Sequence, residues 1–386
     1  MTTLARTREI LAELIGFPTV SADSNLELIT YAATLLSEAG AALSMSRDET
    51  GEKANLFATL GPQIDGGIVL SGHTDVVPVD GQEWTSDPFT LAERGGLLYG
   101  RGACDMKGFI AACLAMAPAF AETELKRPLH FAFTYDEEIG CFGARALMDE
   151  LARAEVRPAV AIIGEPTEMR VIEGHKGCYE YTTEFTGLEG HASEPDRGVN
   201  AVEYAARYIA RLLDLGEQLK SRAPAGSRFE PPWTTLQVGR ITGGAARNMI
   251  AGSCEVEWEM RPVQTSDSDF VKSDLSDFVD TILRPAMHAV SPDANIVTHT
   301  IGEVGGLQVA TESEARAIVT ELTGATEADV VAFGTEAGLF QAAGMSAVIC
   351  GPGSIAQAHK PDEYIALDQL QACLDMLGKL KTRMSR

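Results

Sequence analysis

The sequence predicts an α/β protein in which a domain with a mostly parallel central sheet is interrupted by a smaller α+β domain. In the first third of the chain, short apolar strand segments alternate with helical segments, which is typical of α/β domains. The middle contains strands of alternating polarity and long helices, which is typical of helices on an antiparallel sheet. The α/β pattern then resumes. We expect one domain formed by residues 1–177 and 306–386, and an inserted domain at residues 178–305.

In the first part of the chain, each predicted element follows from the spacing of apolar residues or from a stop signal. Apolar side chains recur at helical intervals near the N-terminus, and Gly40 ends the second helix. Apolar runs bounded by polar segments indicate strands. The predicted helices are residues 4–15, 26–39, 107–120 and 145–151, and the predicted strands are residues 68–71, 129–135 and 159–163.

The inserted part has a different pattern. In residues 179–186, apolar and aromatic side chains alternate with polar ones, as they do in a half-exposed strand. The same alternation marks two further strands, and two long segments have helical spacing. The predicted strands are residues 179–186, 234–241 and 254–261, and the predicted helices are residues 200–215 and 268–288; a helix at 312–323, a strand at 347–350 and a helix at 367–381 complete the first domain.

Composition and charge narrow the class of partner. Lys and Arg number 31 and Asp and Glu number 55, which gives a net charge of −24. This charge repels phosphates and so disfavours nucleic acid and anionic membranes as partners. The cysteines form no CxxC motif, which indicates reduced thiols. The N-terminal segment is predicted to be an amphipathic helix and not a signal peptide, and the apolar run 109–121 is too short to cross a bilayer. We expect a soluble cytoplasmic protein that acts on a small molecule.

Three predicted strands run into residues that can bind a metal ion. His73 follows the first, Glu137 and Glu138 follow the second, and Glu165 follows the third. Because the carboxyl ends of parallel strands meet at one edge of a sheet, we expect these side chains to converge. Neighbouring glutamates point in different directions, so one can bind metal while the other addresses a water molecule.

A hydrolase that uses two metal ions needs this set of groups. Each ion takes imidazole and carboxylate ligands, one carboxylate bridges the pair, and a further carboxylate stays free to remove a proton from water. Asp105 and His359 complete the possible ligands. Each motif alone is weak, because ion pairs, helix caps and turns use the same residues. Their combination at strand ends indicates a metal site.

Several motifs, in this order along the chain, resemble the M20 metallopeptidase and deacylase family. They are GHTDVVPV at 72–79, GRGACDMKG at 100–108, YDEEIG at 135–140, GEPT at 164–167 and GSIAQAHKPDEYI at 353–365. The resemblance covers nearly the whole chain. It implies a zinc-peptidase-like catalytic domain interrupted by a lid or dimerisation domain, and therefore a homodimer that forms through the inserted domain.

The positions that match the family motifs imply two zinc ions, for which cobalt can substitute, bridged by Asp105. His73 and Glu165 match the ligands of one ion, and Glu138 and His359 match those of the other. The remaining matches are Glu137 as the general base, Asp75 as the carboxylate that orients His73, and a cis peptide bond between Asp105 and Met106.

The resemblance also implies residues that contact the substrate. His191 matches the histidine that polarises the scissile carbonyl, often from the partner subunit, and Asn248 and Arg261 match contacts of the inserted domain. Lys176 is a candidate for the substrate carboxylate, although a salt bridge at the domain crossing is equally consistent with its position. Glu336 is a candidate partner for a distal substrate ammonium, although it could instead be a carboxylate at a helix N-terminus.

The implied reaction is hydrolysis of an N-α-acyl amino acid. The segments GHASEPDRGVNA at 190–201 and FGTEAGLF at 333–340 resemble members that convert N2-acetyl-L-ornithine to L-ornithine and acetate. A hydrolase of N-succinyl-diaminopimelate or of another N-acyl amino acid would keep all the metal residues and differ only in its pocket contacts, whereas a peptidase would need a longer cleft and recognition of a free amine. A homologue that binds metal or ligand without catalysis should lack the base or the bridging ligand, and Glu137 and Asp105 are both present.

Overall fold

The structure is a computed structural model that describes residues 2–386. The described residues fall into two compact units. Within the described residues, unit 1 comprises 2–174, Leu307–Val330 and Thr335–Arg386, and unit 2 comprises His175–Gly306 and Val331–Gly334.

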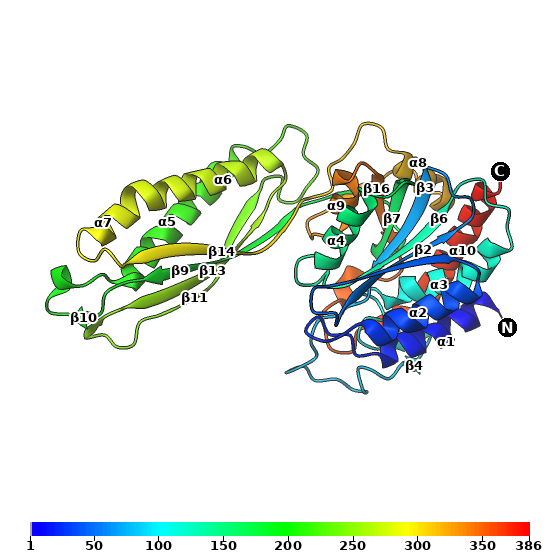
Figure 1. Cartoon of the computed structure of the whole chain (residues 1–386), viewed down its shortest axis with the longest axis horizontal. Coiled ribbons are helices and arrows are strands. Elements are labelled where there is room, and N and C mark those ends of the chain that lie inside the picture. The colour runs from blue at the N-terminus through cyan, green and yellow to red at the C-terminus, as the bar shows by residue number, and fades with distance from the viewer. Residues whose placement is uncertain (1) are drawn as a thin grey trace. The chain divides into compact units, whose positions relative to one another are not determined.

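Unit 1 is built on a mixed sheet whose middle strands are parallel (Figure 1). The strand order is β1-β2-β6-β3-β7-β16-β8-β15. Strands β6, β3, β7 and β16 pair in parallel, whereas β1, β2 and β8 pair antiparallel to their neighbours. The bounds are β1 (Ala42–Arg47), β2 (Ala54–Leu60), β3 (Gly67–His73), β6 (Leu129–Thr134), β7 (Pro158–Pro166), β8 (Ile172–His175), β15 (Asp329–Val331) and β16 (Ser346–Gly351).

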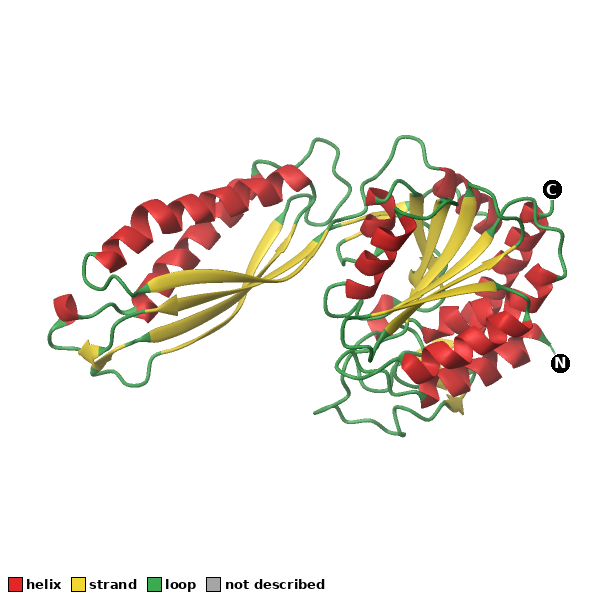
Figure 2. Ribbon diagram, in the orientation of Figure 1, coloured by secondary structure: helices red, strands yellow, loops and turns green. Residues whose placement is uncertain are grey.

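Helices cover both faces of this sheet (Figure 2). Helix α3 (Lys107–Ala121) is apolar on almost all sides because it lies between the sheet and helices α1 (Thr3–Gly16), α2 (Leu26–Glu38) and α10 (Leu367–Met384). Helices α4 (Phe142–Leu151) and α9 (Ala337–Ala342) pack against each other on the opposite face, and α8 (Glu314–Thr323) packs beside α10.

A small antiparallel sheet joins two distant segments of unit 1. Its strands are β4 (Ala92–Arg94), β5 (Leu97–Tyr99) and β17 (Tyr364–Ala366), in the order β17-β5-β4. Tyr364 lies opposite Tyr99 in the ladder. The ladder therefore holds the loop before β17, which carries His359, next to the loop that follows β5.

Unit 2 has helices on one face of an antiparallel sheet, in the strand order β11-β13-β9-β14 (Figure 2). Alternate side chains of the sheet, among them Phe185 and Trp258, form the core with the helices. Its elements are β9 (Cys178–Thr186), β10 (Gly190–His191), the 3₁₀ turn Pro195–Arg197, α5 (Ala201–Lys220), β11 (Thr235–Gly243), β12 (Met249–Ile250), β13 (Ser253–Arg261), α6 (Thr265–Phe278), the π turn Val279–Leu283, α7 (Arg284–His288) and β14 (Asn295–Val304).

The predicted elements are present, and the structure adds others. The single helix predicted at 268–288 is divided by the π turn into α6 and α7. Strands β1 and β2 were not predicted, nor were β14 and the small strands around β17. No helix among residues 2–386 is both long enough and apolar enough to cross a membrane.

Candidate metal centre and catalytic site

Metal-capable side chains converge at the carboxyl ends of the parallel strands in unit 1. His73 is the last residue of β3, the Glu137–Glu138 pair follows β6, and Glu165 lies near the end of β7. Among the described residues, ligand atoms of His73, Glu137 and Glu165 lie within 4.8 Å of one another, as do those of His73, Asp105 and Glu138. The predicted convergence of these side chains is therefore observed.

Asp105 lies between two imidazole rings. Its Oδ1 is 3.0 Å from Nε2 of His73, and its Oδ2 is 3.3 Å from Nε2 of His359. The peptide bond between Asp105 and Met106 is cis, as the family resemblance implies. Each oxygen of one carboxylate thus faces a different imidazole nitrogen, which is the arrangement that a bridging ligand requires.

The imidazole of His73 is fixed in one orientation. Its Nδ1 lies 2.9 Å from the backbone carbonyl of Asp75, and a carbonyl oxygen can only accept, so Nδ1 carries the proton. In the neutral ring this leaves the lone pair on Nε2, which faces Asp105 and lies 3.8 Å from Glu165. Burial disfavours the imidazolium, but the nearby carboxylates of Asp105, Asp75 and Glu165 outweigh it and raise the pKa of His73 well above its usual range, whereas a cation at Nε2 would favour the neutral ring.

The carboxylate of Asp75 lies near His73, and it is bonded to a neighbouring turn. Its Oδ1 is 3.6 Å from Nδ1 of His73, beyond hydrogen-bond distance. It instead accepts hydrogen bonds from Ser21 Oγ at 2.7 Å and from the backbone N–H groups of Glu137 and Glu138 at 3.1 and 3.2 Å. The side chain of Asp75 therefore holds the turn that carries the two glutamates, and its carbonyl orients His73.

The side chains of Glu137 and Glu138 diverge, as their adjacency predicts. Oε2 of Glu138 is 3.1 Å from Nε2 of His359. Glu137 turns the other way, and its Oε1 accepts a hydrogen bond from the Cys141 thiol at 3.6 Å. Burial raises the pKa of Glu137 well above its usual range. The residue before them, Asp136, is anchored by Lys53, whose Nζ lies 2.6 Å from Oδ1.

Glycine allows β7 to bring Glu165 close to the other ligands. A Cβ atom on Gly164 would lie 2.1 Å from the ring of Phe109, and one on Gly351 would lie 1.9 Å from the carbonyl oxygen of Gly164. A larger residue at either position would push β7 away from α3 or β16. Burial, followed by repulsion from Asp105, raises the pKa of Glu165 well above its usual range.

The donor set suits two divalent cations. In the arrangement that the family resemblance implies, His73, Asp105 and Glu165 would hold one ion, and Asp105, Glu138 and His359 would hold the other. Imidazole nitrogens and carboxylate oxygens are ligands that zinc and similar ions accept. Burial and repulsion from Asp105 disfavour the ionised forms of Glu138 and Glu165, and bound cations would favour those ionised forms. Zinc and cobalt both satisfy this donor set.

The predicted substrate contacts in unit 2 lie at opposite ends of its sheet. His191 and Asn248 are neighbours, because β10 pairs with β12 and Ala192 N–H donates to the Asn248 carbonyl at 3.1 Å. Arg261 ends β13 at the other end of the sheet, where its guanidinium binds Glu259 at 2.7 Å. The nine residues of β9 separate the two ends, a distance of roughly 27 Å at a strand rise of about 3.3 Å per residue.

The ring of His191 is arranged as a donor. The backbone N–H of Ser193 donates to Nδ1 of His191 at 3.2 Å, so Nδ1 provides a lone pair and Nε2 carries the proton of the neutral ring. His191 is exposed. Its Nε2–H is therefore available to a hydrogen-bond acceptor outside the chain.

Two candidate substrate contacts are buried. Lys176 is 1% exposed, and its Nζ donates to the backbone carbonyl of Trp233 at 2.9 Å. Glu336 is also 1% exposed, and its two oxygens accept hydrogen bonds from Ser71 at 2.6 Å and Thr134 at 2.9 Å. Glu336 also precedes α9, but its side chain makes no cap hydrogen bond with that helix.

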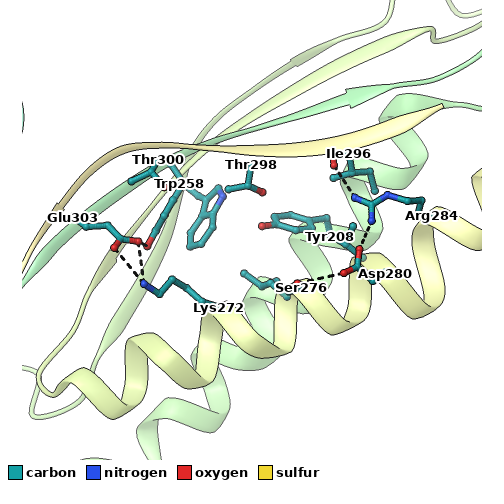
Figure 3. Close-up of a pocket in the computed structure, with 13 residues that line it drawn as sticks. Tyr208, Trp258, Lys272, Ser276, Asp280, Arg284, Ile296, Thr298, Thr300 and Glu303 are labelled. Atoms are coloured by element: carbon teal, nitrogen blue, oxygen red, sulfur yellow. Dashed lines mark hydrogen bonds and ion pairs between the residues drawn. The ribbon is translucent and has the colours of Figure 1, made fainter. Parts of the chain in front are cut away.

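Unit 2 also contains a cavity of about 440 Å³ between α6 and β14 (Figure 3). The aromatic residues that line it are almost inaccessible to solvent, because Tyr208 is 1% and Trp258 is 4% exposed. The charged groups at its edge pair with each other, as Lys272 does with Glu303 at 3.2 Å. We therefore assign the cavity no role in the chemistry.

Comparisons with known proteins agree with the geometry. Residues 69–382 match Peptidase family M20/M25/M40. Acetylornithine deacetylase from Proteus mirabilis is 38% identical over 381 residues, which cover 96% of this chain and 95% of that protein. Acetylornithine deacetylase from Shigella sonnei is 37% identical over 364 residues, or 92% of each chain.

Solved structures share the fold at low sequence identity. An M20 family metallo-carboxypeptidase from Sulfolobus solfataricus has a TM-score of 0.76 at 17% identity, and the match covers 97% of this chain and 98% of that one. A dinuclear metal-binding peptidase of the M20 family from Bacillus subtilis has a TM-score of 0.68 at 15% identity, with 99% and 98% covered. These likenesses confirm the predicted fold class.

The fold and the site together define a metallohydrolase that acts on amide bonds. The chain belongs to Peptidase family M20/M25/M40. Among the described residues, the ligand atoms of His73, Glu137 and Glu165, and those of His73, Asp105 and Glu138, lie close enough together to hold a metal ion.

Proposed function

We propose that this protein hydrolyses N2-acetyl-L-ornithine to L-ornithine and acetate. The observation that carries the proposal is the position of Asp105 between His73 and His359, with the free carboxylate of Glu137 beside the same cluster. Relatives named acetylornithine deacetylase match over nearly the whole chain and support this substrate over other N-acyl amino acids.

Bound cations would polarise the acyl carbonyl and lower the pKa of a water molecule between His73, Asp105, Glu138, Glu165 and His359. Glu137 then removes a proton from this water, whose oxygen forms a bond with the acyl carbon. The carbon–nitrogen bond breaks, and Glu137 returns the proton to the leaving amine nitrogen. The burial that raises the pKa of Glu137 suits this carboxylate to accepting and then donating a proton.

We also propose that His191 stabilises the negative charge that develops on the carbonyl oxygen. The tautomer that Ser193 imposes presents an Nε2–H donor, which is the group that this role requires. Asn248, next to it on the β10–β12 ladder, is proposed as a further substrate contact. Arg261 and Lys176 remain candidates for the substrate carboxylate, although Arg261 already binds Glu259 and Lys176 binds the Trp233 carbonyl.

A homodimer that forms through unit 2 would let His191 act on the partner's site. The chain enters β9 at Cys178, and His191 follows the far end of that strand. The edge strand β14 and helix α5 expose apolar side chains, with Ile301 49% and Leu213 63% exposed. Unpaired strand edges and exposed apolar residues are surfaces that an isologous dimer can bury.

A substrate panel tests the proposed function. Purified protein loaded with zinc would be assayed against the N-acetyl, N-succinyl and N-formyl derivatives of ornithine, and against N-succinyl-diaminopimelate and dipeptides. We expect the highest kcat/KM for N2-acetyl-L-ornithine. A higher value for a succinyl compound or a dipeptide would contradict the proposed substrate and leave the metal site intact.

A further inference from the structure

A buried ion pair contacts the backbone of Asp105, the proposed bridging ligand. Arg101 and Glu363 are each 1% exposed, and Nη1 of Arg101 is 2.8 Å from Oε2 of Glu363. The ring of Trp84 covers the guanidinium, with its centroid 5.0 Å from Cζ. Neither charged residue has a part in the proposed chemistry, so the pair needs another explanation.

On one side, the carboxylate of Glu363 holds the backbone around Asp105. Its Oε1 accepts hydrogen bonds from the N–H groups of Cys104 at 2.9 Å and Asp105 at 3.0 Å, and its Oε2 accepts one from Gly102 at 3.0 Å. These bonds set the main chain from which the Asp105 side chain projects.

On the other side, the guanidinium of Arg101 reaches the main chain of His359 through one residue. Nη2 of Arg101 donates to Oε1 of Gln82 at 2.6 Å, and Nε2 of Gln82 donates to the His359 carbonyl at 3.0 Å. Nη1 also donates to the Lys360 carbonyl at 3.3 Å. The side chain of His359 is 53% exposed, so packing alone does not fix this ring, and its backbone φ of 61° lies in the left-handed region.

We propose that Gln82, Arg101 and Glu363 are positioning residues that set the distance between Asp105 and His359, and so control binding of the cation held by Asp105, Glu138 and His359. The path runs from the Asp105 N–H to Glu363, Arg101, Gln82 and the His359 carbonyl. The position of the other cation depends less on this path of hydrogen bonds, because the Asp75 carbonyl orients His73 and β7 carries Glu165. Groups that orient metal ligands typically affect metal affinity by about 10–100-fold.

Gln82→Ala is the mildest test, because Gln82 is partly exposed and not part of the buried pair. Thr85→Ala is its matched control: Thr85 Oγ1 binds Asp362 at 2.9 Å between the same two loops but lies outside the path. Glu363→Gln tests the buried end, with circular dichroism to check folding. Metal-free proteins would be titrated with zinc by equilibrium dialysis, and hydrolysis of N2-acetyl-L-ornithine would be measured at low and at saturating zinc.

The inference rests on the proposed function of the site, and the two can fail separately. We expect Gln82→Ala to bind its first zinc ion as the wild type does, to bind the second about 10–100-fold more weakly, and to regain activity at saturating zinc. Thr85→Ala should behave as the wild type. If the wild type binds two ions and Gln82→Ala binds both unchanged, or loses both equally, the positioning role is refuted and the site stands. If the wild type binds no zinc, the proposed site itself fails.

Discussion

The carboxylate of Asp75 accepts a hydrogen bond from the backbone N–H of Glu137 at 3.1 Å. The main-chain carbonyl of the same Asp75 accepts the Nδ1 proton of His73 at 2.9 Å. One residue therefore sets the orientation of a proposed metal ligand and the position of the proposed general base.

Asp75→Asn should disturb the base more than the metal ligand. The variant keeps the backbone carbonyl that orients His73. Its side chain has one acceptor oxygen in place of two, however, so one of the Glu137 and Glu138 N–H groups would face an NH₂ donor. We expect kcat to fall by about 10–100-fold, with most of the metal retained. Metal analysis beside steady-state kinetics checks this, and loss of both ions with the activity would show that the carboxylate serves the ligands instead.

The two neighbouring glutamates should be separable by experiment. Glu137→Gln should retain two ions and lose about 10²–10⁴-fold in kcat, because it removes only the group that accepts the proton. Glu138→Gln should instead lower metal content, because Glu138 faces His359. Inductively coupled plasma analysis of both variants is the measurement. Near wild-type turnover in Glu137→Gln with full metal would exclude Glu137 as the base.

Mixed dimers test whether His191 acts across a dimer. A Glu137→Gln chain and a His191→Ala chain, each nearly inactive alone, would be co-expressed with different tags and purified together. If His191 serves the partner's site, the His191→Ala subunit keeps its base and receives an intact histidine, so activity returns at one of the two sites. If His191 acts within its own chain, the mixed dimer should be no more active than the separate variants. A protein that stays monomeric while active would exclude the contribution from a partner.

Glu336 should govern stability and leave substrate choice unchanged. Glu336→Ala leaves the hydroxyls of Ser71 and Thr134 without their buried acceptor, which should lower the free energy of unfolding by about 1–3 kcal/mol. The ratio of kcat/KM for N-acetylornithine to that for N-acetylnorvaline should stay as in the wild type. Denaturant unfolding and the paired kinetics check this. If this kcat/KM ratio falls while the free energy of unfolding is unchanged, Glu336 is instead the partner of the substrate amine.

Periodicity predicted the long elements of the fold because their apolar residues are numerous and regular. Helix α3 and strands β3, β6 and β7 lie close to their predicted bounds. Strand β1 was missed because its side chains are mostly exposed, so it has no apolar run to detect. The three-residue strand β17 is defined by its pairing with the distant β5, a contact that local sequence does not encode.

In the candidate site, too, some residues were predictable from the sequence and some contacts were not. His73, Glu138 and Glu165 were predictable because each follows a recognisable strand or lies in a motif. The task of the Asp75 carboxylate, holding the turn at Glu137, was not predictable, because its hydrogen bonds join residues 62 and 63 positions apart. The pairing of Arg101 with Glu363 spans 262 positions. The charges of Arg101 and Glu363 alone did not indicate that the two residues pair. The hydrogen bonds of Glu336 with Ser71 and Thr134 likewise join residues that are distant in sequence.

In the proposed function, the residues around Asp105 hold two cations, and the site that they form hydrolyses an N-acyl amino acid. The most direct measurement is a titration of metal-free protein with zinc, followed by the rate of L-ornithine release from N2-acetyl-L-ornithine. We expect no turnover without metal, full activity by two equivalents of zinc per chain, and loss of the bound zinc in Asp105→Ala. Undiminished turnover after complete metal removal, or two tightly bound zinc ions in Asp105→Ala, would contradict it.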